Sequence, residues 1–151
     1  MKTALIAYHE NCLDGFTAAW VAHNALKKLG YEVELLAVGY NERSLNRLNN
    51  SVELLQFDEL YIVDFSVPVH FLAMLEQYHP SVKVTLLDHH KTAFENYFPE
   101  HTVTPDSVCE GTIHGAEIIL ANMYSGAGLC WLHFHPGLTI EQLPKLVAFV
   151  Q

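Results

Sequence analysis

The sequence predicts an α/β domain with a mainly parallel β-sheet flanked by helices. Stretches of strand length alternate with stretches of helical periodicity, and several of the strand-length stretches are nearly continuous apolar runs. Such runs are typical of parallel strands that are buried on both faces by helices. The chain has 151 residues, of which 50% are hydrophobic, enough for a substantial core in one domain. We therefore expect residues 1–151 to form a single domain.

The first half of the chain predicts strands and helices in strict alternation. Residues 5–8 form the first predicted strand and residues 32–38 the second. Between them Asp14-Gly15 opens a helix that Gly30 ends, because glycine commonly follows the last helical residue. The helical spacing here involves Phe16, Ala19, Trp20, His23, Ala25, Leu26 and Leu29. A weaker helix follows over residues 44–57, with one apolar face made of Leu45, Leu48, Val52 and Leu55.

The middle of the chain continues this alternation. Residues 60–63 form a continuous apolar strand, Pro68 initiates a helix that runs to Tyr78, and residues 84–87 form the next strand. This order again indicates strand–helix–strand units of a parallel sheet.

The last third is expected to be more helical. Residues 117–123 have helical spacing, and Ser125-Gly126 begins another helix that ends before Pro136-Gly137. Thr139 to Gln142 resembles a capping box at the start of a final helix. The apolar run 146–151 lacks the glycine, proline or basic residue that usually ends a helix, so we expect the domain to be truncated at its C-terminus.

Composition restricts the class of partner. The chain has 8 Lys plus Arg against 17 Asp plus Glu, a formal charge of −9, which disfavours binding to long duplex nucleic acid. The three cysteines lack CxxC pairing, which argues against a disulfide framework and a structural zinc site. The short apolar run before His9 is no signal-peptide core, and no stretch has the length of a membrane span. We expect a cytoplasmic protein with no membrane partner.

Three predicted strands end in side chains that bind metals. His9 follows the first strand, Asp64 follows the strand 60–63, and Asp88-His89-His90 follows the strand 84–87. In an open parallel sheet, ligands bind at the carboxyl ends of the strands, where distant residues meet. The sequence therefore predicts one polar pocket that also includes Asp14.

Each of these signals has a simpler alternative when taken alone. The triplet at residues 88–90 is equally compatible with a solvated loop, and Asp64 with a cap of the helix that Pro68 initiates. Their combination favours a metal site, because a carboxylate is costly to bury unless it is paired or metal-bound. A carboxylate shared by two cations can hold them roughly 3.5–4 Å apart, as in two-metal hydrolysis.

The motifs resemble those of a known superfamily. Residues 9–16 (HENCLDGF), 63–66 (VDFS) and 87–90 (LDHH) have the order and approximate spacing of the first three motifs of the DHH phosphoesterases. This superfamily includes RecJ-type exonucleases, oligoribonucleases, cyclic-dinucleotide phosphodiesterases and family II pyrophosphatases. Residues 125–131 also look like a segment that recurs in small DHH-type proteins. The resemblance covers residues 3 to 135.

The resemblance implies a RecJ-like N-terminal DHH domain with two metal ions, most commonly Mn²⁺, with Mg²⁺ as an alternative. It places His9 and Asp64 at one ion and Asp14, Asp64 and His89 at the other, with Asp64 bridging. His90 would then face the substrate phosphate, and Asp88 would support the site.

The chain departs from the pattern in three ways. Cys12 stands where the first motif usually has an acidic residue, and a thiol is a poor ligand for Mn²⁺. A further downstream Asp ligand is expected, but Asp106 has the wrong surroundings. We also expect no second, substrate-binding domain of the kind the superfamily has, because residues 1–151 contain no match to its glycine-rich motif.

The resemblance and the residues together predict a hydrolase. We expect hydrolysis of a phosphodiester, phosphomonoester or phosphoanhydride in a small phosphorylated substrate, such as a short oligonucleotide or a polyphosphate. One alternative is a metal- or nucleotide-binding module of the same fold that has lost catalysis. Another is an unrelated flavodoxin-like or Rossmann-like regulatory domain in which the strand-end acids bind one cation.

Overall fold

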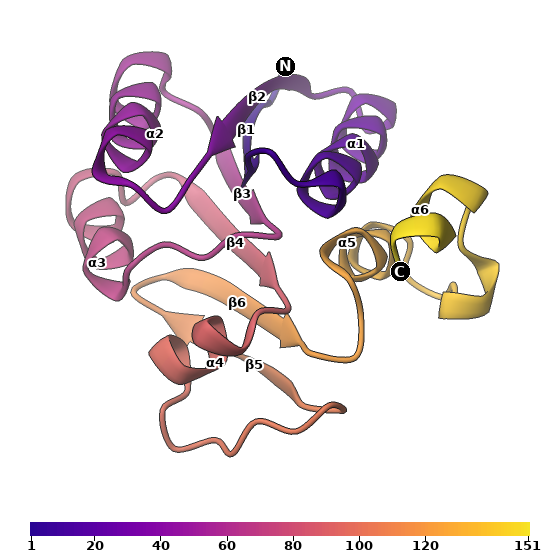
Figure 1. The fold of residues 1–151 in the computed structure, drawn as a ribbon. Helices are drawn as coiled ribbons and strands as arrows, with labels where there is room; N and C mark the ends of the chain where they lie inside the picture. The colour runs from indigo at the N-terminus through magenta and orange to yellow at the C-terminus, as the bar shows by residue number, and fades with distance from the viewer.

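The computed structural model describes residues 1–151, except for the side chains of Leu54 and Leu55 (Figure 1). The predicted place of Leu55 on a helix face therefore lies outside the described residues. The elements follow one another as β1 (Thr3–His9), α1 (Leu13–Lys28), β2 (Glu32–Val38), α2 (Glu42–Leu55), β3 (Glu59–Val63), α3 (Val69–Tyr78), β4 (Lys83–Asp88), α4 (Lys91–Tyr97), β5 (Val108–Ile113), β6 (Ala116–Ala121), α5 (Gly126–Phe134), η1 (Ile140–Gln142) and α6 (Lys145–Val150).

The six strands form one sheet in the order β2-β1-β3-β4-β6-β5. All neighbouring strands are parallel except β5, which pairs with β6 antiparallel at the edge. This arrangement confirms the predicted α/β fold with a mainly parallel sheet. Tyr8 is paired with Val63 and Val63 with Leu87, so the carboxyl ends of β1, β3 and β4 lie level with one another in the sheet. The residues that follow these three positions are therefore brought together.

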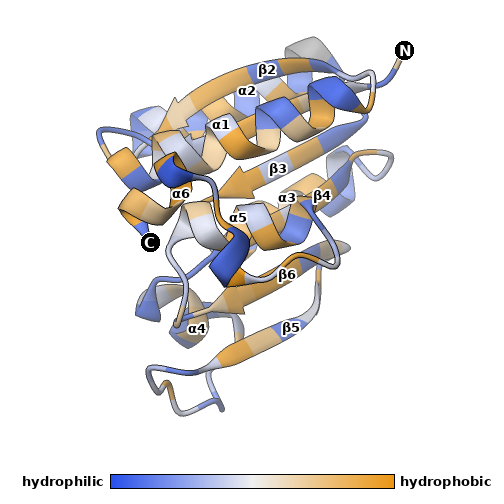
Figure 2. Ribbon diagram, turned by 90° about the vertical axis from the view of Figure 1, so that its right-hand side faces the viewer, coloured by the Kyte–Doolittle hydropathy of each residue, from blue (hydrophilic) through white to orange (hydrophobic). Residues whose placement is uncertain are grey.

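Helices cover both faces of the sheet in two layers (Figure 1). One face carries α2, α3 and α4, and its core includes Leu48, Leu72 and Phe94. The other face carries α1, α5 and α6, with Ala18 and Val147 in its core. The strands between the layers are predominantly hydrophobic along their length (Figure 2). None of the helices in the described part of the chain combines the apolar composition with the length that a bilayer crossing requires.

The helix α1 packs through small residues. Ala18, Ala22 and Ala25 are buried, whereas Phe16 is 55% exposed and Trp20 is also exposed. The regular helical spacing of the aromatic residues therefore does not mark the buried face. These small side chains let α1 approach both the sheet and α5 closely, because they occupy little volume between the backbones.

The predicted helix over residues 117–123 is wrong. This segment is the strand β6, which lies between β4 and β5. Its side chains alternate between faces, with Ala116, Ile118 and Leu120 buried, as the period of two in a strand requires. A tight turn at His114-Gly115, where both φ angles are positive (47° and 70°), makes the hairpin with β5. The nonlocal pairing of β6 with β4 decides its conformation.

The capping box at Thr139 is present, but it caps the short 3₁₀ helix η1 ahead of α6. The helix beginning at Ser125 is confirmed as α5, with the Ser125 hydroxyl accepting a hydrogen bond from the Gly128 N–H at 3.0 Å. The helix α4 and the strand β5 were not expected from the sequence pattern.

The order in which strands are added to the sheet reverses at β1, because β2 and β3 lie on opposite sides of it. After β1 the chain forms β2 on one side, and it returns to form β3 on the other side. The carboxyl ends of β1 and β3 therefore flank a topological switch point, the usual binding position in open α/β sheets. His9 and Asp64 lie at these two ends.

Candidate metal centre

Asp64 occupies the centre of a group of side chains at the carboxyl ends of the strands. This strand-end cluster consists of His9, Asp14, Asp64, Asp88, His89 and His90. It is 1% exposed and directly follows the buried strand β3. Its φ angle is 53°, in the left-handed region that few non-glycine residues adopt, although Asp and Asn adopt it more often than others. Its backbone N–H donates to the carbonyl of Leu87 at 2.9 Å, which holds the turn against β4. Unfavourable backbone conformations of this kind concentrate at functional sites.

The two oxygens of the Asp64 carboxylate face two different sets of side chains. Oδ2 lies 3.5 Å from the Cys12 sulfur and 3.8 Å from His9 Nδ1. Oδ1 lies 3.0 Å from His89 Nε2, which is itself 3.4 Å from Asp14 Oδ2. A carboxylate with a separate group of donors at each oxygen has the arrangement that a bridging metal ligand needs.

Two glycines allow other segments to approach Asp64 closely. A Cβ atom at Gly126 would lie 2.5 Å from Asp64 Cβ, and one at Gly15 would lie 2.4 Å from the His9 carbonyl oxygen. Any larger residue would push α5 or α1 away from the cluster. These glycines therefore let α1 and α5 begin directly against the carboxylate.

Asp14 links the cluster to the start of α5. Its carboxylate accepts hydrogen bonds from the Gly126 N–H at 2.8 Å and the Ala127 N–H at 2.7 Å. Burial and the charge of Asp64 raise the pKa of Asp14 above its ordinary value, and these hydrogen bonds partly offset the rise. Asp14 faces His89 with one oxygen while both oxygens bind the helix terminus, where a negative charge is stabilised.

Asp88 holds His90 in one orientation. The fully buried Asp88 accepts from His90 Nδ1 at 2.7 Å and from the His89 backbone N–H at 2.8 Å, both at Oδ1. The hydrogen bond with Asp88 raises the pKa of His90. Burial alone would lower the pKa of His89, but contact with Asp64 raises it above its ordinary value.

Several buried polar atoms of the cluster form no hydrogen bond among the described residues. They are His9 Nδ1, Asp64 Oδ1 and Asp88 Oδ2. Buried polar atoms are normally paired, so three such atoms in one cluster call for a partner. His9, Cys12 and Asp64 offer ligand atoms within 4.8 Å of one another, and so do Asp64 and the triplet at residues 88–90. The donor set of carboxylates and imidazoles fits divalent cations.

The structure brings all six residues that the sequence singled out to one edge of the sheet: His9, Asp14, Asp64, Asp88, His89 and His90. Their roles as metal ligands or catalytic groups stay predictions. Asp106 lies elsewhere, in the loop before β5, where it is exposed and accepts a hydrogen bond from the Thr104 hydroxyl at 2.6 Å.

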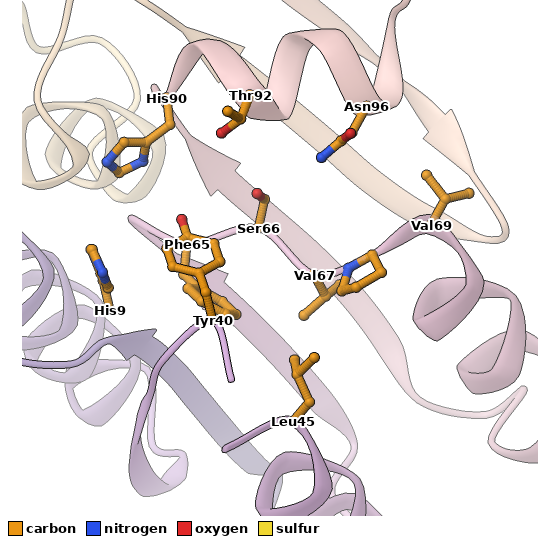
Figure 3. A pocket seen from close by; sticks show the side chains of 11 residues that line it. His9, Tyr40, Leu45, Phe65, Ser66, Val67, Val69, His90, Thr92 and Asn96 are labelled. Atoms are coloured by element: carbon orange, nitrogen blue, oxygen red, sulfur yellow. The ribbon is translucent and has the colours of Figure 1, made fainter. Parts of the chain in front are cut away.

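A cavity of about 690 Å³ opens beside the cluster (Figure 3). His9 and His90 belong to both the cluster and the cavity wall, so the two are continuous. In Figure 3, Thr92 and Asn96 extend from α4 beside His90 along one wall, and Tyr40 and Leu45 lie across from them. The lining residues are His9, Tyr40, Leu45, Phe65, Ser66, Val67, Pro68, Val69, His90, Thr92 and Asn96.

Tyr40 is a site residue that the sequence patterns missed. Its ring lies 4.6 Å from that of Phe65 and 5.3 Å from that of His9, measured between ring centroids. Tyr40 is 56% exposed, yet desolvation beside the cluster and the negative charges of Asp88 and Asp64 raise its pKa to about 12, so it stays a neutral hydrogen-bonding group. Tyr40 comes just after the carboxyl end of β2, and the strand-end rule applied to that strand would have found it.

Comparison with known proteins supports the fold. No protein-family model matches the chain, and no curated protein matches its sequence. Among solved structures, RecJ from Thermus thermophilus in complex with Mn²⁺ is similar, with a TM-score of 0.57, 18% sequence identity and coverage of 88% of this chain. A LacI family transcriptional regulator, CCPA from Weissella paramesenteroides with bound glucose, has a TM-score of 0.49, 10% identity and coverage of 57% of this chain. The chain spans only 17% of the RecJ chain and 32% of the CCPA chain, and the similarity to RecJ shows the fold alone.

Proposed function

We propose that the chain is a DHH-type domain that hydrolyses a phosphoester or phosphoanhydride. The reaction would need two divalent cations, for which Mn²⁺ is the first candidate. The observation that carries the proposal is the buried carboxylate of Asp64, which presents one oxygen to His9 and Cys12 and the other to His89. The RecJ-like fold and the motifs at residues 9–16, 63–66 and 87–90 support it. In this proposal residues 1–151 form a single catalytic domain.

His9 and Asp64 would hold one cation, and Asp14, Asp64 and His89 the other. Bound divalent cations would supply an activated water and would polarise the phosphoryl oxygens. The fit rests on the buried atoms of His9 and Asp64 that have no hydrogen-bond partner among the described residues.

His90 has a different task in this proposal. Its Nδ1 is committed to Asp88, so only Nε2 is free to donate to a phosphoryl oxygen. The hydrogen bond with Asp88 raises the pKa of His90, which favours a ring that carries a proton on Nε2 and can donate it to the phosphate. Asp88 fixes the orientation of the ring, so that the donor is in place before charge develops.

The cavity favours a substrate with an organic group beside the phosphate. Its described lining residues include neither lysine nor arginine, so beyond the two histidines, His9 and His90, a polyphosphate chain would find no cationic side chain there. Its walls combine apolar side chains with the hydroxyl of Thr92 and the amide of Asn96. A nucleobase has apolar faces and polar edges, which matches this combination. We therefore favour a nucleotide or short oligonucleotide.

A binding module without catalysis is the second candidate, and one observation favours it. Both oxygens of Asp14 accept backbone N–H groups from α5, so the helix competes with a cation for this carboxylate. In that case His9, Asp64 and His89 would bind a single ion tightly, and turnover would be absent.

The test uses metal-free protein reconstituted with Mn²⁺, Mg²⁺ or Zn²⁺ and a chromogenic phosphodiester. We expect turnover that depends on the metal and that His90→Ala lowers while its metal content stays unchanged. Binding of one Mn²⁺ without turnover would favour the binding module, and absence of binding would contradict both candidates.

The substrate class is tested with Tyr40→Ala, comparing a dinucleotide with pyrophosphate. Loss of base stacking, about 1–3 kcal/mol, corresponds to an increase in KM for the dinucleotide of about 5- to 140-fold. The KM for pyrophosphate should not change. An equal effect on both substrates would contradict base binding in the cavity.

A further inference from the structure

The Cys12 side chain points toward the strand-end cluster and not toward the helix that it precedes. It occupies the N-cap position of α1, yet its side chain forms no capping hydrogen bond. Its sulfur instead lies 3.5 Å from Asp64 Oδ2. The preceding residue, Asn11, has a positive φ of 55°, and this turn brings the chain from β1 into α1 beside the carboxylate.

A second observation at the same place points to a ligand. His9 Nδ1 is a buried atom without a hydrogen-bond partner among the described residues, and it lies 3.8 Å from the same Asp64 oxygen. Asp64 is 1% exposed, and its Oδ2 faces both this nitrogen and the Cys12 sulfur. The three side chains offer one nitrogen, one sulfur and one oxygen within 4.8 Å of one another.

We infer that Cys12 is a thiolate ligand of the cation held by His9 and Asp64, and that this half of the centre selects Zn²⁺ or Co²⁺ over Mn²⁺. The inference rests on the proposed metal centre and deepens it by assigning different metals to its two halves. The other half, with Asp14, Asp64 and His89, has oxygen and nitrogen donors only and suits Mn²⁺ or Mg²⁺.

The chemistry of the donors supports this assignment. Thiolate sulfur and imidazole nitrogen suit Zn²⁺, whereas Mn²⁺ prefers carboxylate, carbonyl and water oxygens. Three protein ligands of mixed type leave a coordination position open, as in catalytic zinc sites. Binding converts the Cys12 thiol into a thiolate, and its proton is released to solvent.

The other two cysteines provide controls within the chain. Cys130 is fully buried in the core beside α1, and burial raises its pKa well above the ordinary value. Cys109 lies on β5, and burial raises its pKa as well. Neither belongs to the cysteine-containing cluster of possible ligands among the described residues. Cys109→Ser is therefore the matched control for Cys12→Ser.

The first experiment is a Co²⁺ titration of the metal-free protein followed by absorption spectroscopy. A sulfur ligand gives a charge-transfer band in the near ultraviolet, which oxygen and nitrogen ligands do not give. We expect this band in the wild type and in Cys109→Ser, and its loss in Cys12→Ser. In a competition between Zn²⁺ and Mn²⁺, the preference of this half for Zn²⁺ should fall at least about 10–100-fold in Cys12→Asp. Losing a residue that only supports a metal ligand already lowers metal affinity by this factor, so losing a ligand should cost no less.

The second experiment uses the wild-type chain, so it does not depend on how a variant folds. Iodoacetamide alkylation is mapped to each cysteine by peptide mass spectrometry, with and without metal. Zn²⁺ should protect Cys12 at a lower concentration than Mn²⁺ does, because this half binds Mn²⁺ more weakly.

The outcomes separate this inference from the proposed function. If the wild type binds two metal ions but shows no sulfur band, or if Zn²⁺ leaves Cys12 as reactive as before, the thiolate ligand is refuted and the metal centre stands. If the wild type binds no metal ion of any kind, both are refuted.

Discussion

The strand β3 carries a buried acid at each end, and the two acids differ in what surrounds them. Glu59, its first residue, is 6% exposed, and Asp64, the residue after its last, is 1% exposed. Both oxygens of Glu59 accept hydrogen bonds, Oε1 from Tyr31 at 2.8 Å and Oε2 from Tyr61 at 2.6 Å, and Lys2 lies 3.3 Å from Oε1. Asp64 has a thiol contact at Oδ2 and, at Oδ1, only the ring nitrogen of His89 at 3.0 Å, which is not aligned for a hydrogen bond.

The difference separates an acid that serves the fold from one that we expect to serve the proposed metal site. A buried carboxylate whose partners all come from the protein adds to a rigid network and needs no ligand. A buried carboxylate with incomplete hydrogen bonding and a left-handed backbone conformation costs stability unless something else binds it. Glu59 and Asp64 are both acidic and nearly equally buried, so only their hydrogen-bond partners distinguish them.

The largest expected effect is on turnover. Asp64→Asn should reduce metal-dependent hydrolysis to background, because an amide has only one oxygen and no charge and cannot bridge two cations. Asparagine tolerates the left-handed backbone at this position, so the fold should persist. Glu59→Gln is the matched control and should turn over as the wild type does. Steady-state kinetics with Mn²⁺ decide between them, and equal losses in both variants would remove the distinction.

In its hydrogen bonding Asp88 is intermediate between Glu59 and Asp64, because its Oδ1 accepts hydrogen bonds and its Oδ2 accepts none among the described residues. We expect its partner His90 to act on the substrate: His90→Ala should lower kcat about 10²–10³-fold, as loss of one charge-stabilising donor commonly does, while the bound Mn²⁺ stays. His89→Ala should lose Mn²⁺ instead. Metal analysis beside kinetics tests the pair, and the reverse pattern would exchange the roles of His89 and His90.

The next effect is on stability. Glu59→Gln removes the charge that three side chains share, and each group left unsatisfied costs about 1–3 kcal/mol. For a chain of this size Tm should fall by about 2–4 °C for each kcal/mol. Asp64→Asn should change the stability of the metal-free protein less than Glu59→Gln does, because it weakens the contacts with His89 and Cys12 but also relieves the cost of burying a charge. Thermal unfolding without metal measures both, and a larger loss in Asp64→Asn than in Glu59→Gln would contradict the comparison.

The smallest effect is the pH dependence of that stability. Burial alone would raise the pKa of Glu59, but hydrogen bonds from Tyr61, Tyr31 and Lys2 lower it below its ordinary value of 4.5. A carboxylate with a lowered pKa stabilises the folded state above the pKa of the unfolded chain and loses this contribution as pH falls through the folded value. The difference in unfolding free energy between wild type and Glu59→Gln should therefore be constant near neutral pH and shrink below about pH 4.5. A difference that grows on acidification would show that Glu59 is not held as a carboxylate.

The fold and the core of the site could be predicted because they depend on local signals. Apolar runs mark β1, β3 and β4, and the parallel topology then places His9, Asp64 and the triplet at residues 88–90 together. The β5–β6 hairpin was missed because residues 117–123 fit a helix as well as a strand until their partners are known.

Other parts of the site depend on contacts that no local pattern records. Asp14 is hydrogen-bonded to the start of α5 across 112 residues of sequence. Gly126 is required only because α5 begins against Asp64.

Mn²⁺ binding measured by titration calorimetry on metal-free protein tests the bridging role of Asp64 most directly. The bridging arrangement predicts two Mn²⁺ ions for the wild type and for Glu59→Gln, and weakening of both sites together in Asp64→Asn. Two ions bound to Asp64→Asn with wild-type affinity, or loss of one site with the other unchanged, would contradict it.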